Sequence, residues 1–103
     1  MEKEPYAYVY ILASKKNGTL YIGVTRDLGA RVEEHKIKAN PRSFTTRYNV
    51  TRLVWCEGFA QISDAIAYEK RLKKYKRAWK INLIEAVNPD WKEIDTCSGE
   101  FFE

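Results

Sequence analysis

Two tyrosines of this sequence are predicted to share one surface. Tyr10 and Tyr21 lie in the β-branched and aromatic runs 6–13 and 19–24, which flank Asn17-Gly18 and are typical of an antiparallel hairpin with a two-residue turn. Because side chains alternate between the two faces of a sheet, both phenols then point to the same face. A register shift by an even number of residues preserves this arrangement. Phenols placed in this way can transfer protons.

An arginine and the only histidine are predicted to share one face of the next helix. Asp27 is a plausible N-cap, because its carboxylate can accept a backbone N–H of the first turn, and we expect the helix to run to about Ala39. Arg31 and His35 are four residues apart and therefore lie on the same face, among apolar side chains. Guanidinium and imidazole groups bind anions and transfer protons, so this is not a plain core face.

A carboxylate is predicted in the apolar stripe of a later helix, which we expect to begin near Ser63 or Asp64. At 100° per residue, Glu69 falls in the middle of this stripe. A partly desolvated carboxylate needs a positive partner or a metal ion. The partner could be Lys73, one turn later, or Arg31 from the earlier helix, and position alone favours structural pairing and function equally. The apolar members of the stripe are Ile62, Ala65, Ile66 and Leu72.

The remaining segments complete a small α/β (α+β) domain. We expect a polar surface loop over 42–48 after Asn40-Pro41, a third strand over 50–55 and a final amphipathic helix over 78–87. The predicted fold class is a small three-stranded antiparallel sheet flanked by three or more helices. Residues 1–95 are expected to form this single domain, and the acidic tail 96–103 is expected to fray.

Positive charge is concentrated in one segment. The net charge is +4, but residues 1–84 hold 17 basic and 8 acidic side chains, while residues 85–103 hold 1 and 6. Between Lys70 and Lys80, seven of eleven residues are basic and none is acidic. Like charges repel along a helix, and a phosphate backbone would offset this repulsion, so nucleic-acid contact is favoured over a solvated face. The residues predicted to bind nucleic acid are Arg26, Arg47, Lys70, Lys73, Lys74 and Arg77.

Length and composition exclude several classes of protein. A chain of 103 residues has room for one ordinary domain, and 45% hydrophobic with 31% charged residues argues against disorder. No apolar run reaches the roughly 18 residues of a membrane span, and no secretory signal is recognised, so we expect a cytoplasmic protein without membrane contact. Cys56 and Cys97 are too few for a zinc site and are expected to be reduced.

Taken together, these residues resemble the GIY-YIG nuclease superfamily, and in particular its small single-domain bacterial members. Val9-Tyr10-Ile11 is similar to the first half of the family signature, and Tyr21-Ile22-Gly23 is its second half. Arg31 and His35 have the spacing at which the family carries its helix arginine and a histidine or tyrosine. Glu69 lies where the family places its metal-binding glutamate. The resemblance covers about residues 6–89.

The sequence departs from the family pattern at several positions. Val9 stands where the first triplet has its glycine, and Val24 stands where repair nucleases of this superfamily carry a lysine. Asn82, and after it Asn88, is the nearest candidate for the asparagine that some members place after the glutamate helix.

The resemblance implies a metal-dependent endonuclease that hydrolyses phosphodiester bonds in DNA, or RNA, with weak sequence specificity or specificity for a nucleic-acid structure. Glu69 would be a ligand of one Mg²⁺ or Mn²⁺ ion, and Arg31 would hold a phosphate oxygen. Tyr10 or Tyr21 would be the general base, with a pKa lowered by the metal and Arg31, and His35 would orient a tyrosine or transfer protons.

Two further expectations concern the backbone and the class of function. Gly23 is expected to allow close backbone approach at a strand end. The alternative function is a nucleic-acid-binding module with little turnover that acts with a partner protein.

Overall fold

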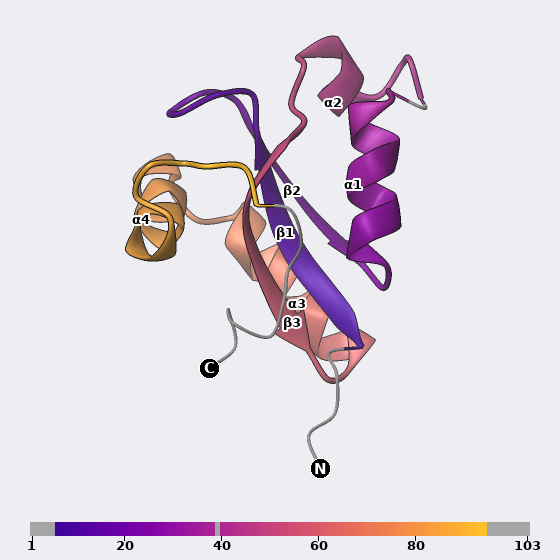
Figure 1. Cartoon of the computed structure of the whole chain (residues 1–103). Coiled ribbons are helices and arrows are strands. Elements are labelled where there is room, and N and C mark those ends of the chain that lie inside the picture. The colour runs from indigo at the N-terminus through magenta and orange to yellow at the C-terminus, as the bar shows by residue number, and fades with distance from the viewer. Residues whose placement is uncertain (1–5, 39, 95–103) are drawn as a thin grey trace.

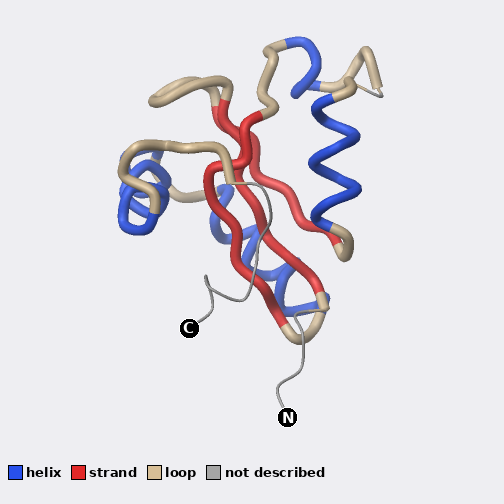
Figure 2. Tube along the Cα trace, viewed as in Figure 1, coloured by secondary structure: helices blue, strands red, loops and turns tan. Residues whose placement is uncertain are grey.

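The computed structural model describes residues 6–38 and 40–94. In these residues it contains a three-stranded antiparallel sheet and four helices, which confirms the predicted fold class (Figures 1 and 2). The elements follow the chain in the order β1 (Ala7–Ala13), β2 (Leu20–Thr25), α1 (Leu28–Lys36), α2 (Phe44–Arg47), β3 (Arg52–Phe59), α3 (Ile62–Lys73) and α4 (Arg77–Val87).

Strand β1 is the centre of the sheet, which has the order β2-β1-β3. The β1–β2 pairing sets Tyr10 opposite Gly23 and Leu12 opposite Tyr21. The expected two-residue turn is wrong, because the Ser14 N–H donates to the Thr19 carbonyl at 3.0 Å and closes a four-residue loop. This moves the register by two residues. The shift is even, so the prediction that both tyrosines share one face is confirmed.

The two faces of the sheet carry different helices. The odd-numbered residues of β1, such as Val9 and Ile11, pack against Ala65 and Leu72 of α3. Tyr10 and Leu12 point the other way and pack with residues of α1. Figure 1 shows α1 and α3 on opposite sides of the strands. A side chain on α1 and one on α3 can therefore meet only around an edge of the sheet.

Helix α1 and the segment after it position the α1 face. The Asp27 side chain accepts the Ala30 N–H at 3.1 Å, which confirms the predicted N-cap. The helix ends at Lys36 rather than near Ala39. The segment predicted as a loop contains the short helix α2, whose N-cap Ser43 accepts the Thr46 N–H at 3.2 Å. Figure 1 shows α2 beside the end of α1.

The second half of the chain differs from prediction mainly in its boundaries. Strand β3 runs over Arg52–Phe59 rather than 50–55. Helix α3 has Gln61 as its N-cap, so neither Ser63 nor Asp64 caps it. The basic segment 70–80 is not one continuous helix, because α3 ends at Lys73 and α4 begins at Arg77. Within the described part of the chain, no helix is long and apolar enough to cross a bilayer.

Two expectations concern the cysteines and the tail. Cys56 is buried in β3 and is disulfide-bonded, so the expectation of a reduced thiol is wrong for this residue. Cys97 and the acidic tail 96–103 lie outside the described residues.

Candidate active site

Tyr10, Tyr21 and His35 form a compact cluster on the α1 face. The Tyr10 hydroxyl lies 3.3 Å from His35 Nε2. The ring centroid of Tyr21 is 6.3 Å from that of Tyr10 and 5.5 Å from that of His35. Tyr10 is completely buried, whereas Tyr21 is partly exposed on the edge strand β2. The two phenols are therefore adjacent, but only Tyr21 faces solvent.

Arg31 joins this cluster from α1, one turn before His35. Burial and the neighbouring Tyr21 raise the pKa of Tyr10 to about 12, although the charge and hydrogen bonding of Arg31 act in the opposite direction. Arg31 Nε also pairs with Glu34 Oε1 at 3.2 Å, and both side chains of this pair are largely exposed. The guanidinium thus lies between the buried phenol and solvent. Arg31 alone therefore does not bring the pKa of Tyr10 below its usual value, and the lowering expected from a bound metal ion stays a prediction.

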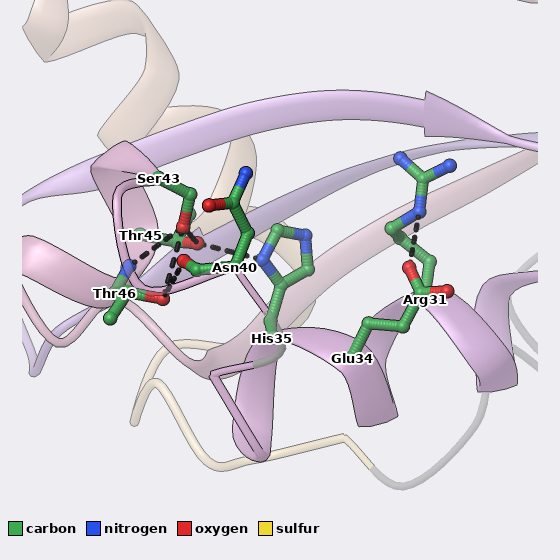
Figure 3. A pocket seen from close by; sticks show the side chains of 7 residues that line it. All are labelled: Arg31, Glu34, His35, Asn40, Ser43, Thr45 and Thr46. Carbon is green, nitrogen blue, oxygen red and sulfur yellow. Dashed lines mark hydrogen bonds and ion pairs between the residues drawn. The ribbon is translucent and has the colours of Figure 1, made fainter.

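A chain of hydroxyl groups behind His35 fixes which ring nitrogen carries the proton (Figure 3). Thr46 Oγ1 donates to the Asn40 carbonyl at 2.8 Å, so it must accept from Ser43 Oγ, which lies at 3.0 Å. A hydroxyl has one proton, so Ser43 accepts from Thr45 Oγ1 at 3.2 Å. Thr45 then accepts from His35 Nδ1 at 2.8 Å. The proton of His35 is on Nδ1.

The tautomer of His35 determines which group donates the hydrogen bond between His35 and Tyr10. Burial and the charge of Arg31 lower the pKa of His35, so the imidazole is neutral at neutral pH. With Nδ1 protonated, Nε2 is an acceptor and the Tyr10 hydroxyl donates to it. His35 is thus held between two hydroxyl groups, donating to Thr45 and accepting from Tyr10.

Glu69 belongs to α3, on the other face of the sheet, and its carboxylate pairs with Lys73 rather than with a residue of this cluster. Its Oε2 is 2.7 Å from Lys73 Nζ, and the side chain of Glu69 is 12% exposed while that of Lys73 is 53% exposed. Of the two ion-pair partners considered from the sequence, Lys73 is the one found. Lys73 in turn lines a cavity of about 270 Å³ together with Tyr21. Because β2 is an edge strand, groups from both faces can reach this cavity.

The donor groups near Glu69 are compatible with a magnesium or manganese ion held mainly by water and substrate. No group of three or more His, Cys, Asp or Glu residues clusters in the part of the chain that the structure describes. Mg²⁺ commonly binds through one or two carboxylates and completes its shell with water and phosphate oxygens. The single partly buried carboxylate of Glu69 fits that pattern. One of its oxygens is also paired with the Lys73 ammonium.

Residues 6–82 match the GIY-YIG catalytic domain family. The chain belongs to the GIY-YIG family. A UPF0213 protein of Staphylococcus haemolyticus is 36% identical over 78 residues, which cover 76% of this chain and 93% of the relative. A UPF0213 protein of Staphylococcus aureus is 33% identical with the same coverage. GIY-YIG domains form a nuclease superfamily, and the chain thus has the catalytic domain of that class.

A solved structure shows the same arrangement. The solution NMR structure of a UPF0213 protein of Bacillus halodurans superposes with a TM-score of 0.52 at 28% sequence identity. The match covers 84% of this chain and 89% of that chain. The three-stranded sheet with its helices is therefore the fold of a GIY-YIG relative.

In this GIY-YIG chain, Gly23 makes room for a ring rather than for backbone. A Cβ built on Gly23 would lie 2.5 Å from Tyr10 Cζ, closer than real Cβ contacts. None of the described glycines has a positive φ, so conformational freedom is not the reason for glycine here. The group that approaches the backbone of Gly23 closely is the aromatic ring of Tyr10 on the paired strand, and Gly23 lies inside β2 rather than at its end.

The residues predicted to bind nucleic acid have different surroundings. Arg77 donates to the carbonyls of Asn17 and Gly18 at 2.8 and 2.7 Å, which holds the start of α4 against the β1–β2 loop. Arg26 and Arg47 stack over Tyr6 and Tyr48, with guanidinium-to-ring distances of 4.9 and 5.8 Å. Lys70 and Lys74 are exposed. Arg77 thus has a structural contact that the basic composition did not indicate.

Asn88, the second asparagine candidate, is a structural residue. It is buried, and its Nδ2 donates to the carbonyls of Val54 and Lys92 at 3.0 and 2.9 Å. Asn82 is exposed on α4.

Several residues around the cluster were missed by sequence reasoning, because they lie in the segment predicted as a polar loop. A signal was available, since Phe44 and Tyr48 are four residues apart in a segment that begins with a possible N-cap serine. The missed residues are Ser43, Phe44, Thr45, Thr46 and Tyr48, together with Lys80, which lines the cavity beside Tyr21.

Proposed function

We propose that this protein is a divalent-metal-dependent endonuclease that hydrolyses phosphodiester bonds in DNA, with weak sequence specificity or specificity for a DNA structure. The supporting observation is the contact of two tyrosines with one histidine, in which Tyr10 donates to His35 Nε2 while Tyr21 packs 5.5 Å away and faces solvent. Membership of the GIY-YIG family supports the same reaction.

The two tyrosines have different parts in this proposal. Tyr10 is completely buried, its pKa is raised to about 12, and its proton is directed to His35, so it positions the histidine. Tyr21 is partly exposed and lines the cavity beside Lys73. A general base must reach the proton that it removes, so we assign the base to Tyr21.

Arg31 is the proposed phosphate ligand. Its present partner Glu34 is exposed, and an exposed ion pair contributes only about 0–1 kcal/mol. A phosphate can replace that carboxylate at little cost, because the planar guanidinium binds both with two parallel hydrogen bonds. Placed beside the tyrosine pair, Arg31 would stabilise the charge that develops on the phosphate oxygens.

Glu69 would hold the metal ion, Mg²⁺ or Mn²⁺, with most of its coordination supplied by water and phosphate. When bound, such an ion polarises the phosphate and lowers the pKa of coordinated water. Lys73 is half-exposed, so its ammonium can leave Glu69 for a phosphate without becoming buried. The exposed Lys70 and Lys74 extend the positive surface along α3.

A second candidate is a nucleic-acid-binding module with little turnover that acts with a partner protein. One observation favours it, because Glu69 is already neutralised by Lys73. In this reading the basic surface remains, and Glu69 serves only as the ion-pair partner of Lys73.

A cleavage assay separates the two candidates. Labelled single-stranded, duplex and branched DNA and RNA would be incubated with Mg²⁺, Mn²⁺ or EDTA, using wild type, Tyr21→Phe and a control that removes a phenol elsewhere. Tyr68→Phe is that control, because Tyr68 packs against Trp55 and Phe59 on the α3 face. We expect metal-dependent cleavage by wild type and Tyr68→Phe, and a loss of roughly 100-fold or more in Tyr21→Phe. Binding by wild type without cleavage under any condition would favour the binding module.

A further inference from the structure

We propose that Phe44 and Tyr48 form a stacking platform for an unpaired base of the nucleic-acid substrate, next to the tyrosine pair. This inference rests on the proposed function in one respect, namely that the substrate is a nucleic acid. It adds the substrate class, a nucleic acid with a single-stranded segment, and it assigns a role to the segment 44–48.

The platform is the outer part of a continuous row of rings. The Tyr48 and Phe44 centroids are 4.8 Å apart, and Phe44 lies 6.4 Å from Tyr21 with an angle of 28° between the ring planes. Tyr21 is followed by His35 at 5.5 Å. The row therefore leads from solvent at Tyr48 to the histidine of the candidate site.

The outer two rings are exposed although both are large and apolar. Phe44 is 46% exposed and Tyr48 is 51% exposed. They are four residues apart, and the one-turn helix α2 sets both on the same side. The other side of α2 holds the buried Thr45, which is bonded to His35. The hydrogen bond between Thr45 and His35 therefore also fixes the direction in which Phe44 and Tyr48 face.

Cations surround the row where a phosphate backbone would pass. Lys73 and Lys80 line the cavity of about 270 Å³ that also contains Phe44 and Tyr21. The guanidinium of Arg47 lies 5.8 Å from the Tyr48 ring centroid. Exposed aromatic rings alternating with lysine and arginine match the requirements of a base and its phosphate, because the rings cover the base and the cations neutralise the backbone. This charge complementarity distinguishes the surface from an apolar protein-docking site.

The geometry favours an unpaired base over a base pair. In a duplex, both faces of each internal base are covered by its neighbours, so a protein ring finds a free face only at an unpaired or terminal base. The cavity is also smaller than the roughly 300–1,000 Å³ of typical ligand sites, which suits one base or one sugar-phosphate unit.

The test measures binding without catalysis. Oligonucleotides that carry 2-aminopurine, as single-stranded DNA, single-stranded RNA and blunt DNA duplex, would be titrated with protein in EDTA while anisotropy and base fluorescence are recorded. Phe44→Leu keeps an apolar side chain and removes the π-face, whereas Phe44→Trp restores it. We expect Phe44→Leu to weaken single-strand binding roughly 5- to 30-fold and to abolish the fluorescence quenching, with duplex binding within about twofold of wild type. Phe44→Trp should restore both signals.

Tyr6→Leu is the matched control. Tyr6 is also an exposed tyrosine beneath an arginine, Arg26, but it precedes β1 at the end of the sheet away from α2. Tyr6→Leu should leave the affinity for single-stranded oligonucleotides unchanged. Equal losses on single strand and duplex, an equal loss in Tyr6→Leu, or no loss in Phe44→Leu would each overturn the platform. Comparing the affinities for single-stranded DNA and single-stranded RNA shows whether the substrate contains deoxyribose or ribose.

The same proteins assayed with Mn²⁺ separate this inference from the proposed function. Single-strand binding that depends on Phe44, without cleavage by any variant, would retain the platform and refute the endonuclease. Cleavage that is insensitive to Phe44→Leu would refute the platform and retain the endonuclease.

Discussion

Replacing Gly23 by alanine should both destabilise the protein and disturb the candidate site. The added Cβ would lie 2.5 Å from Tyr10 Cζ, whereas carbon atoms in contact are normally about 3.5–4.0 Å apart, so the ring must move by roughly 1 Å. The hydroxyl of that ring is 3.3 Å from His35 Nε2, already near the limit of a hydrogen bond. A movement of this size away from the histidine breaks the contact.

The magnitude follows from the lack of free space around Tyr10. Its side chain is completely buried between the sheet and α1, so it cannot turn into solvent. Overpacking of a buried site typically costs about 1–3 kcal/mol. Each kcal/mol shifts the Tm of a domain of this size by about 4–8 °C, so we expect Gly23→Ala to lower the Tm by roughly 4–24 °C.

Gly29→Ala is the matched control, because the same substitution there should have the opposite sign. Gly29 lies in the first turn of α1, and the nearest atom to an added Cβ is Asp27 Oδ1 at 3.9 Å. Alanine in a helix is favoured over glycine by about 0.8–1.0 kcal/mol in interior positions, so this variant should be slightly more stable than wild type.

The assay combines thermal melts with NMR of the histidine ring. His35 is the only histidine, so its ring nitrogen signals need no assignment. We expect both nitrogen shifts to change in Gly23→Ala and to stay near the wild-type values in Gly29→Ala. If Gly23→Ala were as stable as wild type with unchanged ring signals, the packing of the Tyr10 ring over Gly23 would be refuted as the reason for this glycine.

The remaining predictions concern four other contacts. Glu69→Gln should change the free energy of unfolding by less than about 1 kcal/mol, because its partner Lys73 is half-exposed. The same variant should lose metal-dependent cleavage. A large loss of Tm with cleavage retained would refute the metal-ligand role. The lowered pKa of His35 means that the folded protein binds fewer protons than the unfolded chain, so Tm should fall as pH drops below about 6.5, and His35→Gln should flatten this slope. Thr45→Val should remove the acceptor of Nδ1 and increase the Nε2-protonated tautomer, visible in the ring nitrogen spectrum. The logarithm of the binding constant for duplex DNA should fall with the logarithm of salt concentration at a slope of about −3 to −5. Lys74→Gln should make this slope shallower by about 1. Arg77→Gln should leave the slope unchanged and lower the Tm, because Arg77 holds the β1–β2 loop.

The fold was largely predictable because strand periodicity tolerates errors of register. The sequence indicated the hairpin and the shared face of Tyr10 and Tyr21, although the loop has four residues instead of two. An even shift leaves every side chain on its face. The helix α2 was not predicted, because one turn is too short to show periodicity and its polar residues are typical of a loop.

The site was predictable where local spacing decides it and not where tertiary packing does. Arg31 and His35 share a face because they are one helical turn apart, which spacing alone reveals. The position of Glu69 on the opposite face, reached around the edge of β2, depends on how α3 packs against the sheet. The raised pKa of Tyr10 likewise depends on its complete burial, which a strand pattern does not distinguish from the half-burial of Tyr21.

The central position of β1 has a consequence for the order of folding during synthesis. Tyr10 and His35 are separated by only 25 residues, so the hairpin and α1 can assemble by local contacts as soon as they leave the ribosome. At that stage one edge of β1 has unpaired backbone groups, because its second neighbour, β3, begins at Arg52. The nascent chain is therefore expected to expose an apolar strand edge until β3 is made, and this intermediate is the species most open to aggregation or to capture by a chaperone.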